Sequence, residues 1–468
     1  MLKERYSRSF LEKVPVPSKP KNPAVYVIGA YFALIILGTL LLSLPIAQEK
    51  PVALIDNIFI SASAVCVTGL ASIDIGSMYS HFGHWVIILL MQAGGLGVMT
   101  FSTTIILFAG MRPSFKYISV FTEEFSHHDF VPLQVVLKAV VPFTLVMEGI
   151  GFFTFLWQFN ETNLYDRAFS ALFHTISLFC NVGLSLYPDS LMQFGHNPLV
   201  VLVSCALVIT GGFGFIASME LPNLFKKRVK VSLHTKLALI FTSVLLVAIT
   251  AGFLIMEYSN ALVADSLPQK ILNSFAYSTM SRTAGINFSE ISTITSGTLM
   301  MTLIAMFIGA NPGSCGGGIK TTTFAVVVIL AINRLRGKSK VDVRGKSIPQ
   351  DIVNKAVYLF IISAVIITFS TFILLLTETG SVPYATVASD DISKGHYLHF
   401  AQIVFESISA FATCGLSLGA TPDLSIAGKL VVSFIMFVGR MGPMFLISTV
   451  VQKTDDQVWE SEENVMIG

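Results

Sequence analysis

Charged residues are scarce in this chain of 468 residues. They make up only 12% of the sequence, whereas hydrophobic residues make up 53% and the mean hydropathy is +0.73. Soluble domains carry about 25% charged residues, so the composition excludes a soluble globular protein and indicates a polytopic membrane protein. The net charge of +2 gives no sign of nucleic-acid binding, because membrane topology accounts for where the cations lie.

Cysteine is also rare, and its spacing fits neither a metal site nor a redox site. The five cysteines form no CxxC pair, and four of them lie at predicted membrane depth. We therefore expect buried thiols that pack as small hydrophobic groups, without a disulfide or a zinc site. The five are Cys66, Cys180, Cys205, Cys315 and Cys414.

Enzyme motifs are missing from the apolar stretches. No HExxH pair, paired carboxylates or Ser/His/Asp set lies at membrane depth, and His174 is isolated. The glycines of 313–318 followed by Lys320 look like a phosphate loop, but no strand precedes them and they lie inside a span. The sequence therefore predicts no enzyme activity and no organic cofactor, and any nucleotide control must come from another chain.

Eight apolar stretches are long enough to cross a membrane, which takes roughly 20 residues. Most of the 30 Lys and Arg residues fall before the first stretch, between successive pairs, or just after the last. By the positive-inside rule, the chain is a multi-pass plasma-membrane protein with both termini in the cytosol. The stretches are 24–46, 85–110, 139–159, 199–221, 237–256, 297–332, 356–376 and 430–451.

A short pattern occurs four times, each time between two apolar stretches. Phe is followed by Ser or Thr four residues on, by Gly six residues later, and then by Leu or Ile. The roughly ten helical residues before each glycine are too few to cross, so each segment must enter from outside and return. The copies are Phe59, Ser63, Gly69 and Leu70; Phe173, Ser177, Gly183 and Leu184; Phe275, Thr279, Gly285 and Ile286; and Phe405, Ser409, Gly415 and Leu416.

Four such re-entrant turns are suited to an ion pore. Non-helical backbone persists at membrane depth only where it is buried in protein or lines a watery cavity. Turns gathered around one axis meet that condition, and their carbonyls could replace the hydration shell of an ion beside the negative ends of the helices. The pattern predicts an all-α polytopic membrane protein with four tandem span–pore helix–span repeats, in pseudo-fourfold symmetry around a central pore.

Two other interpretations use the same features. Glycine commonly ends short interfacial helices, but four copies in one register favour the pore. A cation-coupled secondary transporter with a midplane site is the alternative function, although repeats in one orientation argue against its inverted-repeat form. Unitary conductance in patch recordings would separate the two, because transporter turnover is too slow to see.

The stretch 297–332 is too long and too rich in glycine for one helix. It would run about 54 Å as a straight helix, and its middle combines Pro312 with a run of glycines. A proline kink at a tight helix crossing is the simpler alternative, but it does not need the whole run. We predict two helices joined by a gating loop beneath the turns, formed by Gly309, Ala310, Asn311, Pro312, Gly313, Ser314, Cys315, Gly316, Gly317, Gly318 and Lys320.

Arg440 is a cation in the middle of the last apolar stretch. A charge at that depth is costly and normally faces a cavity or a partner. The stretches align through Gly94, Gly211 and Gly309, and the other copies then carry a small residue where Arg440 stands. Snorkelling is the alternative, but the mid-span depth disfavours it. We predict that Arg440 faces the permeation path near the loop carbonyls, as part of the gate.

Arg282 lies three residues before Gly285, at the end of the third short helix. A cation at a helix C-terminus complements the helix dipole. That explanation is sufficient at the level of sequence, so no role in the pore is assigned to it.

The repeated unit, with one glycine per filter segment, resembles the Trk/Ktr/HKT superfamily of potassium-translocating membrane subunits. The likeness runs from residue 24 to residue 451 and is closest to the bacterial KtrB branch, because no extra N-terminal pair of spans is present. The resemblance implies a potassium-selective, channel-like uptake subunit with sodium as a further candidate ion. It also implies a homodimer, with a KtrA-like cytosolic ring of nucleotide-binding subunits.

On that resemblance, the four segments around the glycines form the ion selectivity filter. They depart from the TVGYG of tetrameric channels, so selectivity weaker than in those channels is expected. Potassium would bind at the backbone carbonyls of Thr68, Val182, Ala284 and Cys414. The filter residues are Val67, Thr68, Gly69 and Leu70; Asn181, Val182, Gly183 and Leu184; Thr283, Ala284, Gly285 and Ile286; and Thr413, Cys414, Gly415 and Leu416.

The repeats divide the chain into consecutive parts. A basic N-terminal segment without a cleavage site is expected to remain as a cytosolic tail. The parts are a tail at 1–23, repeats at 24–111, 112–236, 237–346 and 347–452, and a C-terminal tail at 453–468.

Overall fold

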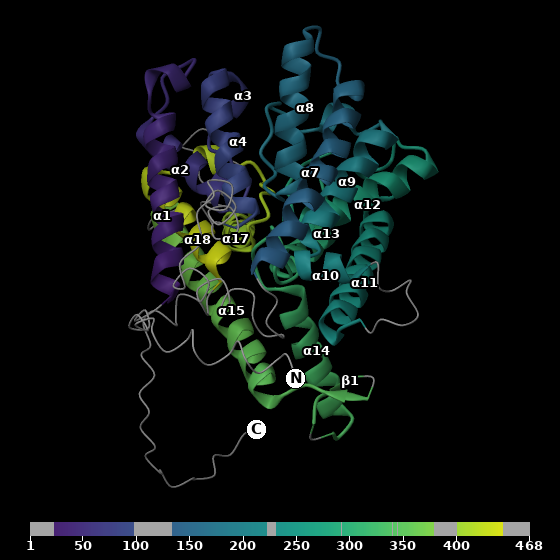
Figure 1. The fold of residues 1–468 in the computed structure, drawn as a ribbon. Helices are drawn as coiled ribbons and strands as arrows, with labels where there is room; N and C mark the ends of the chain where they lie inside the picture. Colours follow the sequence, from purple (N-terminus) through teal and green to yellow (C-terminus); the bar gives the residue numbers. More distant parts are fainter. Residues whose placement is uncertain are drawn as a thin grey trace, which may run out of the picture.

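The computed structural model describes residues 23–97, 133–221, 231–291, 293–338, 340–343, 345–378 and 400–442. Almost all of each predicted tail and the predicted cytosolic ends of two spans, 98–110 and 443–451, lie outside these ranges. The described residues are largely helical (Figure 1). They depart from the all-α prediction in one antiparallel pair, β1 (Asp342–Val343) with β2 (Lys346–Ser347), close to the helix α14 (Thr321–Leu335).

The helices follow the predicted order of a span, a short helix and a second span, four times over. The first spans are α1 (Pro23–Leu42), α7 (Leu133–Gln158), α11 (Leu233–Glu257) and α15 (Gln350–Glu378). The short helices, which the sequence predicts as pore helices and which keep that name here, are α2 (Leu54–Val65), α8 (Leu164–Phe179), α12 (Leu267–Thr283) and α17 (Phe400–Ala412). The second spans are α4 (His81–Gly95), α9 (Pro198–Gly212), α13 (Ser296–Phe307) and α18 (Ile426–Met441).

Short helices complete the described chain. The α-helical turns are α3 (Ile75–Met78) and α10 (Phe215–Glu220), and the 3-10 turns are η1 (Pro45–Ala47), η2 (Met192–Phe194) and η5 (Thr421–Asp423). Within the described ranges, three helices are long and apolar enough to cross a membrane, namely Val140–Gln158, Leu233–Glu257 and Gln350–Glu378.

The described helices of the second spans end early in more copies than the sequence predicted. The break in the third copy is confirmed, because α13 ends at Phe307 and α14 begins at Thr321. No break was predicted in the stretches 85–110, 199–221 and 430–451. In those copies α4, α9 and α18 each end just before a glycine with positive φ, at Gly97, Gly214 and Gly442. Such a glycine ends a helix, but hydropathy does not register it, because the apolar composition continues beyond the break.

The four sets of helices close into a ring. Each pore helix packs against the spans of its own set. Each second span also packs against the pore helix of the next set, in the contacts α4–α8, α9–α12 and α13–α17. The contact of α18 with α2 returns from the last set to the first. The pore helices therefore lie between spans of two sets, which explains their buried Phe59, Phe173 and Phe405.

In each later set, the last residue of the first span is hydrogen-bonded to the residue that caps the second span. Gln158 accepts a hydrogen bond of 2.7 Å from the side chain of Asn197, which caps α9. Glu257 accepts from the backbone N–H of Thr295 at 2.9 Å, and Glu378 accepts from that of Ser425 at 2.9 Å. Thr295 and Ser425 cap α13 and α18, so each carboxylate also lies favourably at a helix N-terminus.

Candidate functional site: four glycine turns and a glycine-rich loop

The chain turns sharply where three of the pore helices end. Val67, Asn181 and Thr413 have left-handed φ angles of +59°, +57° and +49°. Two residues later the glycines of the same copies, Gly69 and Gly183 among them, have φ near +90°. A left-handed conformation is costly for a β-branched residue such as Val67, and strain of this kind clusters at functional sites.

The four predicted filter glycines contact one another's backbones in a closed circle. A Cβ atom built on Gly69 would lie 2.0 Å from the carbonyl oxygen of Val182, and one on Gly183 would lie 1.9 Å from that of Ala284. The same holds for Gly285 against the carbonyl of Cys414 at 2.4 Å, and for Gly415 against that of Thr68 at 2.3 Å. No side chain fits at such distances, so all four positions require glycine.

The Ser of the repeated pattern supports the turn in three copies. Ser63 Oγ accepts a 3.0 Å hydrogen bond from Gly69 N–H, and Ser409 Oγ accepts a 3.1 Å bond from Gly415 N–H. Ser177 Oγ instead donates to the carbonyl of Leu184 at 2.6 Å. These bonds satisfy polar groups of buried, non-helical backbone, which would otherwise destabilise the fold. The pattern that marked the repeats therefore marks residues that hold the turns.

The predicted loop, Gly309–Gly318 with Lys320, is closed at its root by backbone pairing. Gly309 N–H donates to the carbonyl of Ile319 at 2.9 Å, and Thr321 N–H donates to that of Ala310 at 3.0 Å. The loop therefore leaves α13 and enters α14 at nearly one point. Lys320 Nζ donates back to the carbonyl of Gly316 at 2.7 Å, which keeps that side chain on the loop.

The rest of the loop lies against the C-terminal ends of α9, α12 and α17. Asn311 and Cys315 donate backbone N–H groups to α9, with 3.1 Å from Cys315 to the carbonyl of Gly211. Gly317 N–H donates to Thr413 Oγ1 at 2.8 Å. A Cβ on Gly316 would lie 3.1 Å from Thr283 Cγ2. Thr283 and Thr413 belong to the predicted filter segments, so the loop lies directly beside the circle of turns.

Arg440 joins the loop to the first copy. Its guanidinium donates to the carbonyls of Cys315 in the loop and of Gly94 near the end of α4. Arg440 is thus beside the loop carbonyls, as predicted, and it links three helix sets through one planar group of donors.

Arg282 is the residue that sequence reasoning missed. It is buried, and its guanidinium donates to the carbonyl of Gly309 at 3.1 Å and to Thr321 Oγ1 at 3.0 Å. Thr321 Oγ1 itself donates to Gly309 at 2.8 Å, so the three groups close the root of the loop. A signal was available, because Arg282 aligns with Cys66, Cys180 and Ala412, which are small residues in the other copies.

Comparison with known proteins gives this arrangement a family. Residues 9–461 match the model of the TrkH family, whose description is "Cation transport protein". The chain belongs to the TrkH family of cation transport proteins. It is therefore a membrane cation transporter and not an enzyme.

Individual members of the family are similar along nearly their whole length. The chain is 36% identical over 452 residues to the Ktr system potassium uptake protein B of Bacillus subtilis, covering 95% of this chain and 96% of that one. It is 31% identical over 457 residues to the potassium/sodium uptake protein NtpJ of Enterococcus hirae, covering 96% and 98%. The solved potassium transporter TrkH of Vibrio parahaemolyticus has the same fold, with a TM-score of 0.71 at 16% identity over 94% of this chain and 86% of that chain.

Proposed function

We propose that the chain is the potassium-translocating subunit of a Ktr-type uptake system in the plasma membrane. The observation that carries the proposal is the closed circle of Gly69, Gly183, Gly285 and Gly415, each packed against the backbone of the next segment. A circle of this kind brings four sets of carbonyl groups around one axis. The similarity to proteins named for potassium uptake supports potassium as the ion.

The ion binds at backbone carbonyls. Thr68, Val182, Ala284 and Cys414 supply the oxygens that replace its hydration shell, and the C-terminal ends of the four pore helices add partial negative charge. One glycine per segment gives fewer carbonyl rings than a TVGYG filter. Sodium therefore competes more effectively than in a tetrameric channel, in keeping with a relative named for both ions.

The pore has pseudo-fourfold symmetry. Its support is the recurring contact of each second span with the pore helix of the next set, including the return from α18 to α2. A chain with four unequal copies cannot be strictly symmetric, so each copy can carry a different task. The third copy supplies the loop and the fourth supplies Arg440.

The gate is the loop from Gly309 to Gly318, together with Lys320 and Arg440. The position of the loop supports this assignment. The loop contacts Thr283 and Thr413 beside the filter, and Arg440 holds it through a hydrogen bond to the carbonyl of Cys315. In the held state the loop and a positive charge both oppose the passage of a cation. Opening requires a second state in which these hydrogen bonds are broken.

A homodimer with a cytosolic nucleotide-binding ring controls this gate. The names of the relatives, which describe a Ktr system, support a multi-component assembly. The excess of Lys and Arg in the segments 226–236 and 334–355 supports a cytosolic face on that side. Both termini are on the same side by this rule.

Rubidium uptake tests the proposal. The chain is expressed in a strain deficient in potassium uptake, with and without a Ktr-type cytosolic partner, and rubidium entry is measured against added potassium and sodium. Entry that potassium suppresses at lower concentration than sodium is expected, and the partner should change its rate. Patch recordings of the same preparation should show unitary currents. Uptake without any unitary current would favour the coupled secondary transporter.

A further inference from the structure

The chain returns from each glycine turn to its second span through a segment that contacts a neighbouring copy. We call these stretches the return segments. In three copies, the residue three positions after the filter glycine is held, directly or through one side chain, by the copy that precedes it in the ring. The return segments are 70–80, 184–197, 286–291 with 293–295, and 416–425.

Two of these contacts are made by a glycine of the preceding return segment. A Cβ atom built on Gly76 of α3 would lie 2.0 Å from the carbonyl oxygen of Leu186, and one on Gly195 would lie 2.4 Å from that of Phe288. Gly195 has φ of −58° and ψ of −27°, which any residue can adopt. The close approach of the next copy, and not the backbone conformation, therefore requires glycine at position 195.

The contact of the fourth copy with the first uses side chains. Ser72 Oγ donates a 2.7 Å hydrogen bond to Asp56 Oδ1, and Lys429 of α18 donates to the same oxygen at 2.8 Å. In the fourth copy, Leu418 stands three residues after the glycine, and its carbonyl accepts a 3.3 Å bond from Gln402 of its own pore helix. The first three copies therefore share a dependence on the copy before them.

The third return segment is joined to the second by further hydrogen bonds. Asn287 N–H donates to Ser190 Oγ at 3.1 Å, and Leu191 N–H donates to the carbonyl of Asn287 at 3.1 Å. Gln269 of α12 donates to the carbonyl of Gly195 at 2.6 Å. Ser190 has a left-handed φ of +58°, a conformation that persists in such a residue only where its surroundings hold it. The second copy thus binds the third segment on both backbone groups of Asn287.

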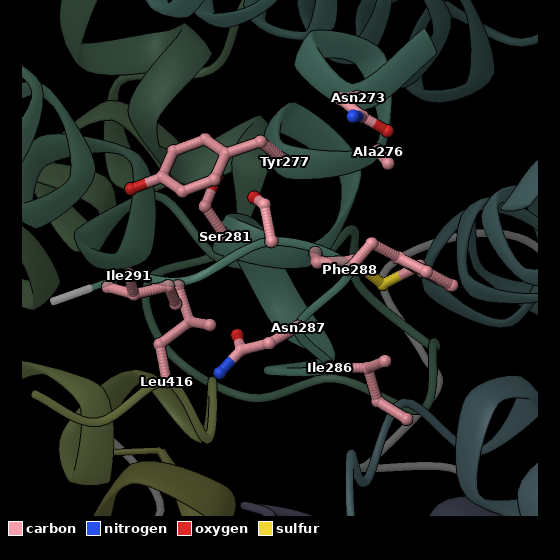
Figure 2. A pocket seen from close by; sticks show the side chains of 11 residues that line it. Asn273, Ala276, Tyr277, Ser281, Ile286, Asn287, Phe288, Ile291 and Leu416 are labelled. Carbon is pink, nitrogen blue, oxygen red and sulfur yellow. The ribbon is translucent and has the colours of Figure 1, made fainter. Parts of the chain in front are cut away.

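The third return segment also borders a void. Ile286, Asn287 and Phe288 line a cavity of about 10 Å³ together with side chains of α12 and with Leu416 of the fourth copy (Figure 2). Atoms beside a void lack packing partners on that side. The position of this segment therefore depends more on the second copy than that of a fully packed segment would.

The preference of a filter for one ion depends on where its carbonyl groups stand. Leu186 and Phe288 are each three residues from a glycine of the proposed filter. We propose that Gly76 and Gly195 are positioning residues, which set the potassium preference by placing the filter segment of the next copy. The second and third filter segments are then placed from two sides, by their own pore helix and by the preceding return segment. The inference rests on the proposed function, since it assumes that the four turns form an ion filter.

Gly195→Ala and Gly76→Ala test the inference, because each adds one methyl group at a backbone conformation that alanine can adopt. Gly83→Ala is the matched control. Its Cβ would lie 2.4 Å from the carbonyl oxygen of Ala47, a steric clash of the same kind between η1 and α4 within the first copy. For each variant, rubidium uptake is measured alone and against added potassium or sodium. The melting temperature of each purified protein is recorded in one fixed salt.

Gly195→Ala and Gly76→Ala should each lower the preference for potassium over sodium about fivefold while rubidium still enters, because overpacking displaces the neighbouring backbone. Gly83→Ala should lower the melting temperature by a similar amount and leave the preference at the wild-type value. Ser190→Ala removes the acceptor for Asn287 N–H without adding an atom. It should lower the preference about threefold, as expected for one hydrogen bond.

If Gly76→Ala does not fold, Gly195→Ala and Ser190→Ala decide the matter. A wild-type preference in both of these folded variants would overturn the inference. An equal loss of preference in Gly83→Ala would also overturn it, because the effect would then follow general destabilisation. Gly183→Ser separates these results from a failure of the proposed function. If Gly183→Ser also keeps the wild-type preference, the filter assignment itself is wrong.

Discussion

The proposed filter and the proposed gating loop lie side by side and are both rich in glycine, yet they are held in different ways. The filter is backbone packed on backbone, with no room for a Cβ at Gly183 or Gly415. The loop is held by donors from elsewhere, namely Arg440 at Cys315 and Arg282 at Gly309. Close packing of main chain cannot be relaxed without moving the helices behind it, whereas hydrogen bonds can be exchanged one at a time. On the proposed function, the filter is the fixed element and the loop is the movable one.

The largest effect is expected where the backbone leaves no room. Gly183→Ser adds a Cβ that would lie 1.9 Å from the Ala284 carbonyl, at a φ of +87°. We expect a tenfold or greater loss of potassium preference, which corresponds to about 1.4 kcal/mol or more, measured by sodium competition against rubidium uptake. Gly149→Ser is the control, since nothing lies within 4 Å of its Cβ position. Unchanged selectivity in the serine variants of all four filter glycines would remove the filter assignment.

The next effect concerns the loop as a whole. Removing Asn311–Gly316 takes away the part between the paired root and Gly317, and the root bonds at Gly309 and Thr321 can still form. Ion flux into proteoliposomes should rise, because the obstruction is gone while the packing of α13 and α14 is kept. A correctly assembled deletion variant with equal or lower flux would mean that the loop is a structural connection and not a gate.

Substitutions of Arg440 test the proposed gate at a single residue. Arg440→Ala removes the donors to Cys315 and Gly94 together with the positive charge, so basal flux should rise, though less than in the loop deletion. Arg440→Lys keeps the charge with fewer donors and should give an intermediate flux. Combined with the deletion, Arg440→Ala should add less than its separate effect, because both remove one barrier. Strict additivity would show that the two act independently.

A smaller effect is expected at the root of the loop. Arg282→Gln removes the donors to Gly309 and Thr321, but the backbone pairing of the root stays in place. We expect a modest rise in basal flux. Thr321→Val removes the shared hydroxyl, so the double variant should show less than the sum of the two single effects in a double-mutant cycle. If the effect of the double variant on flux equals the sum of the two single effects, Arg282 does not act through the loop root.

The smallest effect concerns the hydroxyls behind the turns. Ser63→Ala and Ser409→Ala each remove an acceptor for a filter N–H and should lower potassium preference about fivefold, the usual weight of one hydrogen bond. Thr279→Ala, at the equivalent position, loses a bond within its own helix and should leave selectivity near wild type. Equal losses in all three would contradict the difference between the third copy and the others.

The sequence was sufficient for features that repeat or that violate a local rule. The spacing of Phe59, Ser63 and Gly69 located the short helix α2 and the turn after it, and the glycines around Pro312 predicted the break between α13 and α14. Arg440 stood out because a charge is out of place at mid-span. Each of these signals lies within one short window of the chain.

Features that depend on distant contacts could not be predicted in this way. The partner of Gly69 is Val182, and the partners of Arg282 are Gly309 and Thr321. Nothing local to those residues distinguishes a bond to a loop from complementation of a helix dipole. The ends of α4 and α9 before Gly97 and Gly214 could not be predicted, because one glycine in an apolar run is a weak signal.

The fastening of each second span to the first has a consequence for biosynthesis. The hydrogen bonds Asn197–Gln158 and Thr295–Glu257 each lie within one helix set. Each of these bonds can therefore form soon after the second span of its set leaves the ribosome. The contact of Gly415 with Thr68 instead needs both ends of the chain. Translation should therefore yield stable hairpins one after another, while an ion path is absent until the fourth hairpin has docked on the first. A chain truncated before α17 is expected to insert without conducting, which would protect the cell from leaks during synthesis.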